Sequence, residues 1–185
     1  MKKIELLSPA KNAKLAICAI DYGADAVYIG ANSYGARVNA GNPIEDIIKV
    51  VEYAHKFNSK VYVTVNTILN NNEIKNAQKL IYDLYSINVD AIIFQDMGLL
   101  ELELPPIKLF ASTQCHNVSF EKVKFLEQCG ISRIILAREL SLEQIKNICQ
   151  NTNCEIETFI HGALCVSYSG QGYLSAYNGN RSANR

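Results

Sequence analysis

The sequence lacks an excess of charge, because 18 lysines and arginines balance 18 aspartates and glutamates. This balance removes the simplest argument for a nucleic-acid partner but leaves RNA binding by a local patch or by another domain open. No apolar run approaches the ~20 residues that a bilayer requires. The opening MKKIELLSP contains Glu5 and no long apolar stretch, which is not typical of a secretion signal. The six cysteines form no CxxC pair, so we interpret them as reduced thiols, most of them buried in the core. These absences predict a cytoplasmic protein without a membrane span.

Short apolar or β-branched runs recur about every 25 residues along the chain. The seven runs begin at Ile4, Ala26, Lys60, Ala91, Ile107, Ile131 and Cys154. Between them apolar residues recur with helical spacing, for example at Ile47, Val50, Val51 and Ala54. Ser119 and Ser141 precede two of these segments as candidate N-caps, and Gly23 and Gly130 stand where helices should end. Strands that alternate with helices predict right-handed βαβ units and a parallel sheet.

Two observations favour a barrel over a doubly wound sheet. No GxGxxG or GxxxxGK[ST] nucleotide-binding motif follows any strand. Polar residues follow the strands at their C-terminal ends, where barrel enzymes assemble their sites: Ser8, Gly30, Asn66, Gln95, Asp96, Thr113, Gln114, Arg138, Glu139 and His161. We therefore predict an α/β fold, a (β/α) TIM-barrel-like parallel barrel with about seven βα units, as a single domain over residues 1–185. Because a complete barrel uses about 250 residues, we expect this one to be incomplete, with open edges that favour homo-oligomers.

The candidate site residues have structural as well as functional interpretations. Cys165 is either a packed thiol or a ligand or nucleophile, and His161 is either an acid or base or a histidine satisfied by nearby backbone. Gln114, Arg138 and Glu139 stand where a barrel site would place polar groups, and Arg138 suits a carboxylate or phosphate. The alternative for Arg138 and Glu139 is an ion pair that closes the rim. For His116, which follows a strand without an obvious partner, we favour a structural role.

The stretch from Glu157 onward resembles the signature of the collagenase-like peptidases, peptidase family U32. That signature is E-x-F-x-x-G-[SA]-[LM]-C, four residues, then G-x-C-x-[LIVM]-S. The chain matches it at Glu157, Phe159, Gly162, Ala163, Leu164, Cys165, Gly170, Leu174 and Ser175. Further segments resemble the family too: ELLSPA, DAVYIG, VNT, FQDMG, the AST-Q stretch at 111–114, LAREL and GNRSANR. The resemblance covers essentially the whole chain.

One departure from the signature concerns a cofactor. The resemblance implies that full-length relatives hold an iron–sulfur cluster with four cysteines. Cys165 corresponds to the first of them, and the resemblance therefore implies that it binds the cofactor as a metal ligand. Position 172 should supply the second, but it is Gly172, which has no ligand atom. We therefore expect that this chain binds no cluster and is catalytically inactive on its own.

The resemblance leaves two kinds of activity open. One is oxygen-independent hydroxylation of an RNA base or a quinone precursor, with the substrate bound through a further C-terminal part. The other is proteolysis of a peptide or collagen, through Cys165 and His161 or an unidentified site. The sequence has no GxSxG or HExxH, and a Cys165–His161 pair has no evident third orienting group. We therefore favour hydroxylation, while an inactive barrel fragment remains a third interpretation.

Overall fold

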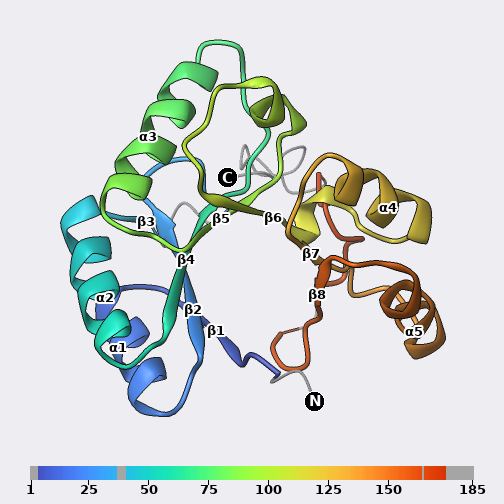
Figure 1. Cartoon of the computed structure of the whole chain (residues 1–185), viewed down its shortest axis with the longest axis horizontal. Helices are drawn as coiled ribbons and strands as arrows, with labels where there is room; N and C mark the ends of the chain where they lie inside the picture. The colour runs from blue at the N-terminus through green and yellow to red at the C-terminus, as the bar shows by residue number, and fades with distance from the viewer. Residues whose placement is uncertain (1–3, 37–40, 164, 174–185) are drawn as a thin grey trace.

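The fold is built on one curved, fully parallel sheet (Figure 1). The structure is a computed structural model, which describes residues 4–36, 41–163 and 165–173. Its seven main strands are β1 (Leu7–Ala10), β2 (Ala26–Ala31), β4 (Lys60–Val65), β5 (Ala91–Phe94), β6 (Lys108–Ala111), β7 (Arg133–Ile135) and β8 (Glu155–Glu157). They lie in the order β1-β2-β4-β5-β6-β7-β8, and a two-residue strand, β3 (Gly41–Asn42), pairs with β2. The seven predicted strands and their parallel arrangement are confirmed, but the first begins at Leu7 and not at Ile4, so Ser8 lies within β1 and does not follow it.

Helices connect the strands and cover the outside of the curved sheet (Figure 1). They are α1 (Ala13–Asp21), α2 (Ile44–Lys56), α3 (Ile74–Ser86), α4 (Phe120–Gln128) and α5 (Leu142–Asn151), with short 3₁₀ turns η2 (Met97–Glu101) and η3 (Thr113–Cys115). Ser119 and Ser141 cap α4 and α5 as predicted, each accepting a hydrogen bond from a backbone N–H three residues later. Gly23 and Gly130 follow α1 and α4 with φ of 97° and 84°, a left-handed conformation that favours glycine.

The alternation of side chains along each strand produces two apolar layers. In β4, Val61, Val63 and Val65 face the helices and belong to the larger core, whereas Tyr62 points into the barrel. The interior layer consists of Ala26, Tyr62, Ala91, Ile93, Phe110 and Ile135, with Leu7 and Tyr28 packed against it. Each large side chain buried in this way stabilises the fold by about 1.5–3 kcal/mol. The centre of the barrel is therefore filled with side chains.

The sheet ends at β1 and β8, which face each other across the opening of the curve (Figure 1). Arg133 of β7 lies inside this opening and is only 8% exposed. Its guanidinium forms ion pairs with Glu5, just before β1, at 2.6 Å and with Glu155 of β8 at 2.7 Å. It also packs over the rings of Tyr62 and Phe110. The two edges of the sheet are thus joined by an ion cluster.

Two carboxyl groups of this cluster have pKa values that are shifted in opposite directions. Burial alone would raise the pKa of Glu5, but hydrogen bonds from Arg133, Lys60 and Tyr62 outweigh it and lower that pKa to about 2. In Glu157 burial dominates and raises the pKa to about 7, against the opposing effect of Arg133, whose Nη1 is 3.4 Å from Oε2. Glu157, which belongs to the family signature, therefore lies in the structural cluster between the sheet edges.

The cysteine prediction was wrong in most positions. Only Cys115 is buried, with a pKa that burial raises to about 12, and Cys154 is half-buried. Cys18, Cys129 and Cys149 are exposed. No helix in the described part of the chain is long and apolar enough to cross a membrane.

Candidate functional site

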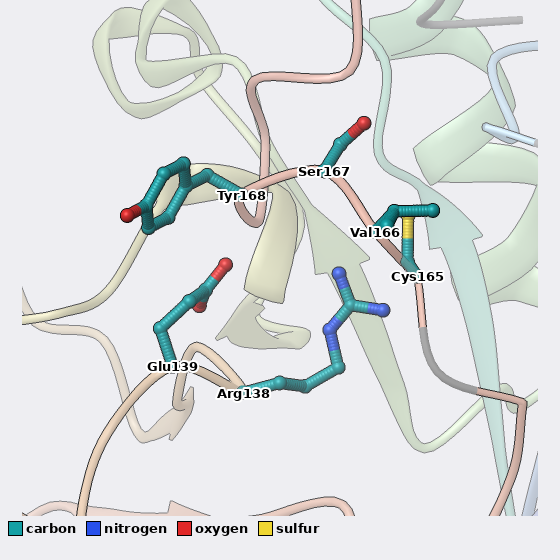
Figure 2. Close-up of a pocket in the computed structure, with 6 residues that line it drawn as sticks. All are labelled: Arg138, Glu139, Cys165, Val166, Ser167 and Tyr168. Atoms are coloured by element: carbon teal, nitrogen blue, oxygen red, sulfur yellow. The ribbon is translucent and has the colours of Figure 1, made fainter.

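A pocket of about 220 Å³ opens beyond the C-terminal end of β7, where the β7–α5 loop meets the segment after β8 (Figure 2). It is lined by Arg138, Glu139, Cys165, Val166, Ser167 and Tyr168. Figure 2 shows the Arg138 guanidinium pointing toward the backbone of the 165–167 segment, with the Glu139 carboxylate below Tyr168. Parallel strands deliver their C-terminal loops to one end of a barrel, and this shared end brings residues 138–139 and 165–168 together.

Arg138 and Cys165 form the chemically distinctive part of the pocket. The Nε of Arg138 is buried and has no hydrogen-bond partner among the described residues. The Cys165 side chain is exposed, and a hydrogen bond from the Ser167 backbone lowers its pKa, with Arg138 adding to the effect. The pocket thus places the Arg138 guanidinium beside the Cys165 thiol, whose pKa is lowered.

Glu139 holds the opposite wall of the pocket through Ser169. Its carboxylate accepts a hydrogen bond from the Ser169 backbone N–H. Burial is the largest single influence and would raise the pKa of Glu139, but the hydrogen bonds it accepts, that from the Ser169 backbone first, and the Arg138 charge together lower that pKa. The Ser169 carbonyl in turn accepts from Nδ1 of His116 at 2.8 Å. Glu139 therefore attaches the segment that contains Ser169 to the β7–α5 loop.

The next residue, Gly170, lies directly against the loop after β6. With φ of 76°, it presses on the carbonyl of Gln114 so closely that a Cβ would overlap the carbonyl oxygen. The same carbonyl accepts a hydrogen bond from the Gln95 side chain at 3.2 Å. Gln114 thus contributes its backbone to this contact.

The structure brings together some of the predicted site residues and separates others. Arg138, Glu139 and Cys165 share the pocket, and Gln114 lies under the neighbouring residue Gly170. His161 is exposed and is not among the pocket-lining residues. The signature residues Leu164, Leu174 and Ser175 lie outside the described residues. Sequence reasoning missed the contact of His116, because its partner is 53 residues away.

The residues of this site do not fit a four-cysteine cluster. Within residues 4–36, 41–163 and 165–173, no group of three or more histidine, cysteine, aspartate or glutamate side chains is arranged to hold a metal ion. The second signature position is Gly172, so Cys165 is the one signature cysteine in this sequence. A Cβ at Gly172 would lie 3.7 Å from the Cβ and Oγ of Ser167, an ordinary contact, so a cysteine has room there. What is missing at this position is the ligand atom.

Comparison with known proteins shows the family to which the chain belongs. The profile of peptidase family U32 matches residues 11–185, so the chain belongs to this family. It is 56% identical over 183 residues to the 23S rRNA 5-hydroxycytidine C2501 synthase of Escherichia coli (strain K12), covering 99% of this chain and 28% of that protein. It is 39% identical over 188 residues to tRNA hydroxylation protein P1 of Bacillus subtilis (strain 168), covering 100% of this chain and 44% of that protein. The chain thus spans less than half the length of these relatives.

A solved structure supports the fold assignment. The U32 peptidase Mk0906 superposes with a TM-score of 0.69 at 16% sequence identity, over 84% of this chain and 68% of that one. At this identity the likeness concerns the fold alone, and it confirms the predicted barrel-like α/β architecture.

Proposed function

We propose that this chain forms the barrel part of a protein that hydroxylates an RNA base without using molecular oxygen. The observation that carries the proposal is the 56% identity to a relative named as a 23S rRNA hydroxycytidine synthase, because it extends over 99% of the chain and includes the pocket region. The second relative, named for tRNA hydroxylation, supports the same class of substrate. A cytoplasmic location is consistent with these substrates.

The pocket has groups that suit an RNA ligand. The Arg138 guanidinium lines the pocket, and donation from an arginine to a phosphate or base oxygen is common in RNA recognition. Tyr168 is 68% exposed beside the pocket, so its ring is available for stacking on an unpaired base. We assign substrate binding to Arg138 and Tyr168 and a supporting role to Glu139. The iron–sulfur cluster of full-length relatives is an expectation from the family resemblance.

Proteolysis is the second candidate, favoured by the family's peptidase name and by the exposed Cys165 thiol of lowered pKa. A cysteine protease also needs a histidine base within hydrogen-bond reach of its thiol. His161 is not among the residues that line the pocket with Cys165, and His116 is engaged with the Ser169 carbonyl. This arrangement favours RNA binding over proteolysis.

The test measures binding of fluorescent single-stranded RNA, with pyrimidine-rich and purine-rich sequences compared. Arg138→Gln should weaken binding about tenfold, since one good arginine contact is worth about 1–3 kcal/mol. Lys146→Gln on the exposed face of α5, outside the pocket lining, is the matched control for a lost positive charge and should change affinity less than twofold. Equal effects of both substitutions would contradict the proposed site. Cleavage of gelatin by the wild type that is lost in Cys165→Ala would favour the peptidase.

The open sheet edges carry a further expectation about partners. Because β1 and β8 are the terminal strands of the sheet, we expect association between copies of the chain through these edges. Light scattering that shows only monomers at high concentration would contradict this expectation.

A further inference from the structure

The segment that forms one wall of the pocket is attached to the barrel mainly through Ser169. The backbone N–H of Ser169 donates to Glu139, its carbonyl accepts from His116 Nδ1 at 2.8 Å, and its Oγ lies 3.4 Å from Nη2 of Arg138. The residue is only 2% exposed. Its backbone and side-chain polar groups are thus held by side chains from two loops, those after β6 and after β7. We call this set of contacts the Ser169 latch.

Of the three side chains that contact Ser169, His116 is the one that does not line the pocket. It adopts a left-handed backbone with φ of 57°, which is uncommon for a residue other than glycine. This conformation places its ring edge-on to Tyr168, with 6.5 Å between ring centroids. Because a carbonyl can only accept, Nδ1 must carry the proton in this bond. Unusual backbone conformations persist where the surroundings fix them, and they concentrate at functional sites.

The backbone contact at Gly170 gives the latch a defined stopping point. The segment approaches the Gln114 carbonyl so closely that only a glycine fits. The hydrogen bonds at Ser169 hold the segment down, while the Gln114 carbonyl limits how far it can descend. Together they fix the height of Cys165–Tyr168 above Arg138.

We infer that His116 is a positioning residue, which holds Ser169 so that the segment 165–168 forms the pocket against Arg138. Any effect of His116 on RNA rests on the proposed function, but the positioning itself does not. Among the described residues, His116 forms a hydrogen bond with Ser169 and a ring contact with Tyr168, and it is not one of the pocket-lining residues. It therefore acts through Ser169.

Two substitutions separate the hydrogen bond from the backbone conformation. His116→Gly removes the donor but accepts the left-handed backbone without strain. His116→Asn also tolerates that backbone and retains an amide donor close to the position of Nδ1. Both lose the ring contact with Tyr168, so the difference between them isolates the hydrogen bond. Glu139→Ala and Glu139→Gln form a second pair, because glutamine keeps an oxygen that accepts from Ser169.

Amide hydrogen exchange measures the latch directly. Peptides that cover 166–173 should exchange about fivefold faster in His116→Gly and Glu139→Ala, the factor expected for one lost hydrogen bond. His116→Asn and Glu139→Gln should restore the wild-type rate to within about twofold. Exchange in β4 and β5 should not change in any variant. Unchanged exchange at 166–173 in His116→Gly and Glu139→Ala, or a failure of Asn to restore it, would overturn the inference.

A second readout tests positioning at the pocket itself. The Nε–H of Arg138 is buried without a partner among the described residues, so it should give a slowly exchanging NMR resonance, assigned by its loss in Arg138→Lys. His116→Gly should broaden or remove this resonance and His116→Asn should restore it. A resonance that is unaffected in His116→Gly would reduce His116 to a local structural role and refute positioning. If the wild type binds no RNA, the proposed function fails, while these two measurements still decide the inference.

Discussion

Replacing Gly170 with alanine should detach the pocket wall from the barrel. Gly170 has φ of 76°, and a Cβ there would overlap the carbonyl oxygen of Gln114 and lie 3.0 Å from its carbonyl carbon. The obstacle is backbone, so a side-chain rotation cannot relieve it. The segment must rise, and the hydrogen bonds that hold Ser169 must lengthen or break.

The expected magnitude combines two contributions. A left-handed alanine is disfavoured by about 1–2 kcal/mol, and the loss of one or two hydrogen bonds adds about 1 kcal/mol each. The opening of segment 165–173 should therefore become easier by about 2–4 kcal/mol, which corresponds to a 30- to 1,000-fold faster amide exchange of its protected groups. The free energy of global unfolding should change far less, since residues 165–173 contribute nothing to either apolar core.

Gly172→Ala is the matched control within the same segment. Its Cβ would meet Ser167 at 3.7 Å, an ordinary contact, and its backbone is not left-handed. Exchange at 165–173 should stay within about threefold of wild type in this variant. If Gly170→Ala and Gly172→Ala gave the same exchange rates, the close contact with Gln114 would not exist in solution and the reasoning would be refuted.

Three further outcomes follow from the cluster and the cofactor position. Arg133→Met should lower the free energy of unfolding in urea by about 1.5–3 kcal/mol, because Glu5 loses its ion pair with Arg133 but keeps Lys60 and Tyr62 as partners. The exposed Lys49→Met should lower it by less than about 1 kcal/mol, and similar losses would contradict the burial argument. The raised pKa of Glu157 means that the protonated carboxyl stabilises the folded state, and this stabilisation is present below pH 4.5 and is lost as the pH rises through about 7. Glu157→Gln should therefore gain stability relative to wild type between about pH 5 and pH 8, by up to about 3 kcal/mol. Parallel pH profiles of stability for the two proteins would argue against this role of Glu157. Anaerobic incubation with iron and sulfide should leave this chain without a cluster, because Gly172 offers no ligand; stoichiometric iron and sulfide on the purified chain would show otherwise.

The regular elements could be predicted because their signals are local. A run such as KVYVTV at 60–65 indicates a buried parallel strand by itself, and Ser119 and Ser141 cap helices through bonds that span three residues. The convergence of Arg138 and Glu139 with Cys165 followed from the rule that loops after parallel strands share one end of the barrel.

Features that depend on orientation or distant contacts could not be predicted. Ile145 and Ile148 turn α5 toward the core, so Cys149, one step of about 100° further round the helix, faces solvent. Composition alone cannot reveal that rotation. The bond from His116 to Ser169 joins residues 53 positions apart, and no local pattern marks it.

The ion cluster between the sheet edges has a consequence for the order of folding. Arg133 and Glu5 are separated by 128 residues, so their contact closes a loop of most of the described chain. Such long-range contacts carry the largest loop-closure entropy, so this one should form after the neighbouring βα units have paired. Substitutions at Arg133 or Glu5 should therefore accelerate unfolding and leave the folding rate almost unchanged. The residues that join the two edges would then set how long the folded barrel lasts, while the local βα units set how fast it forms.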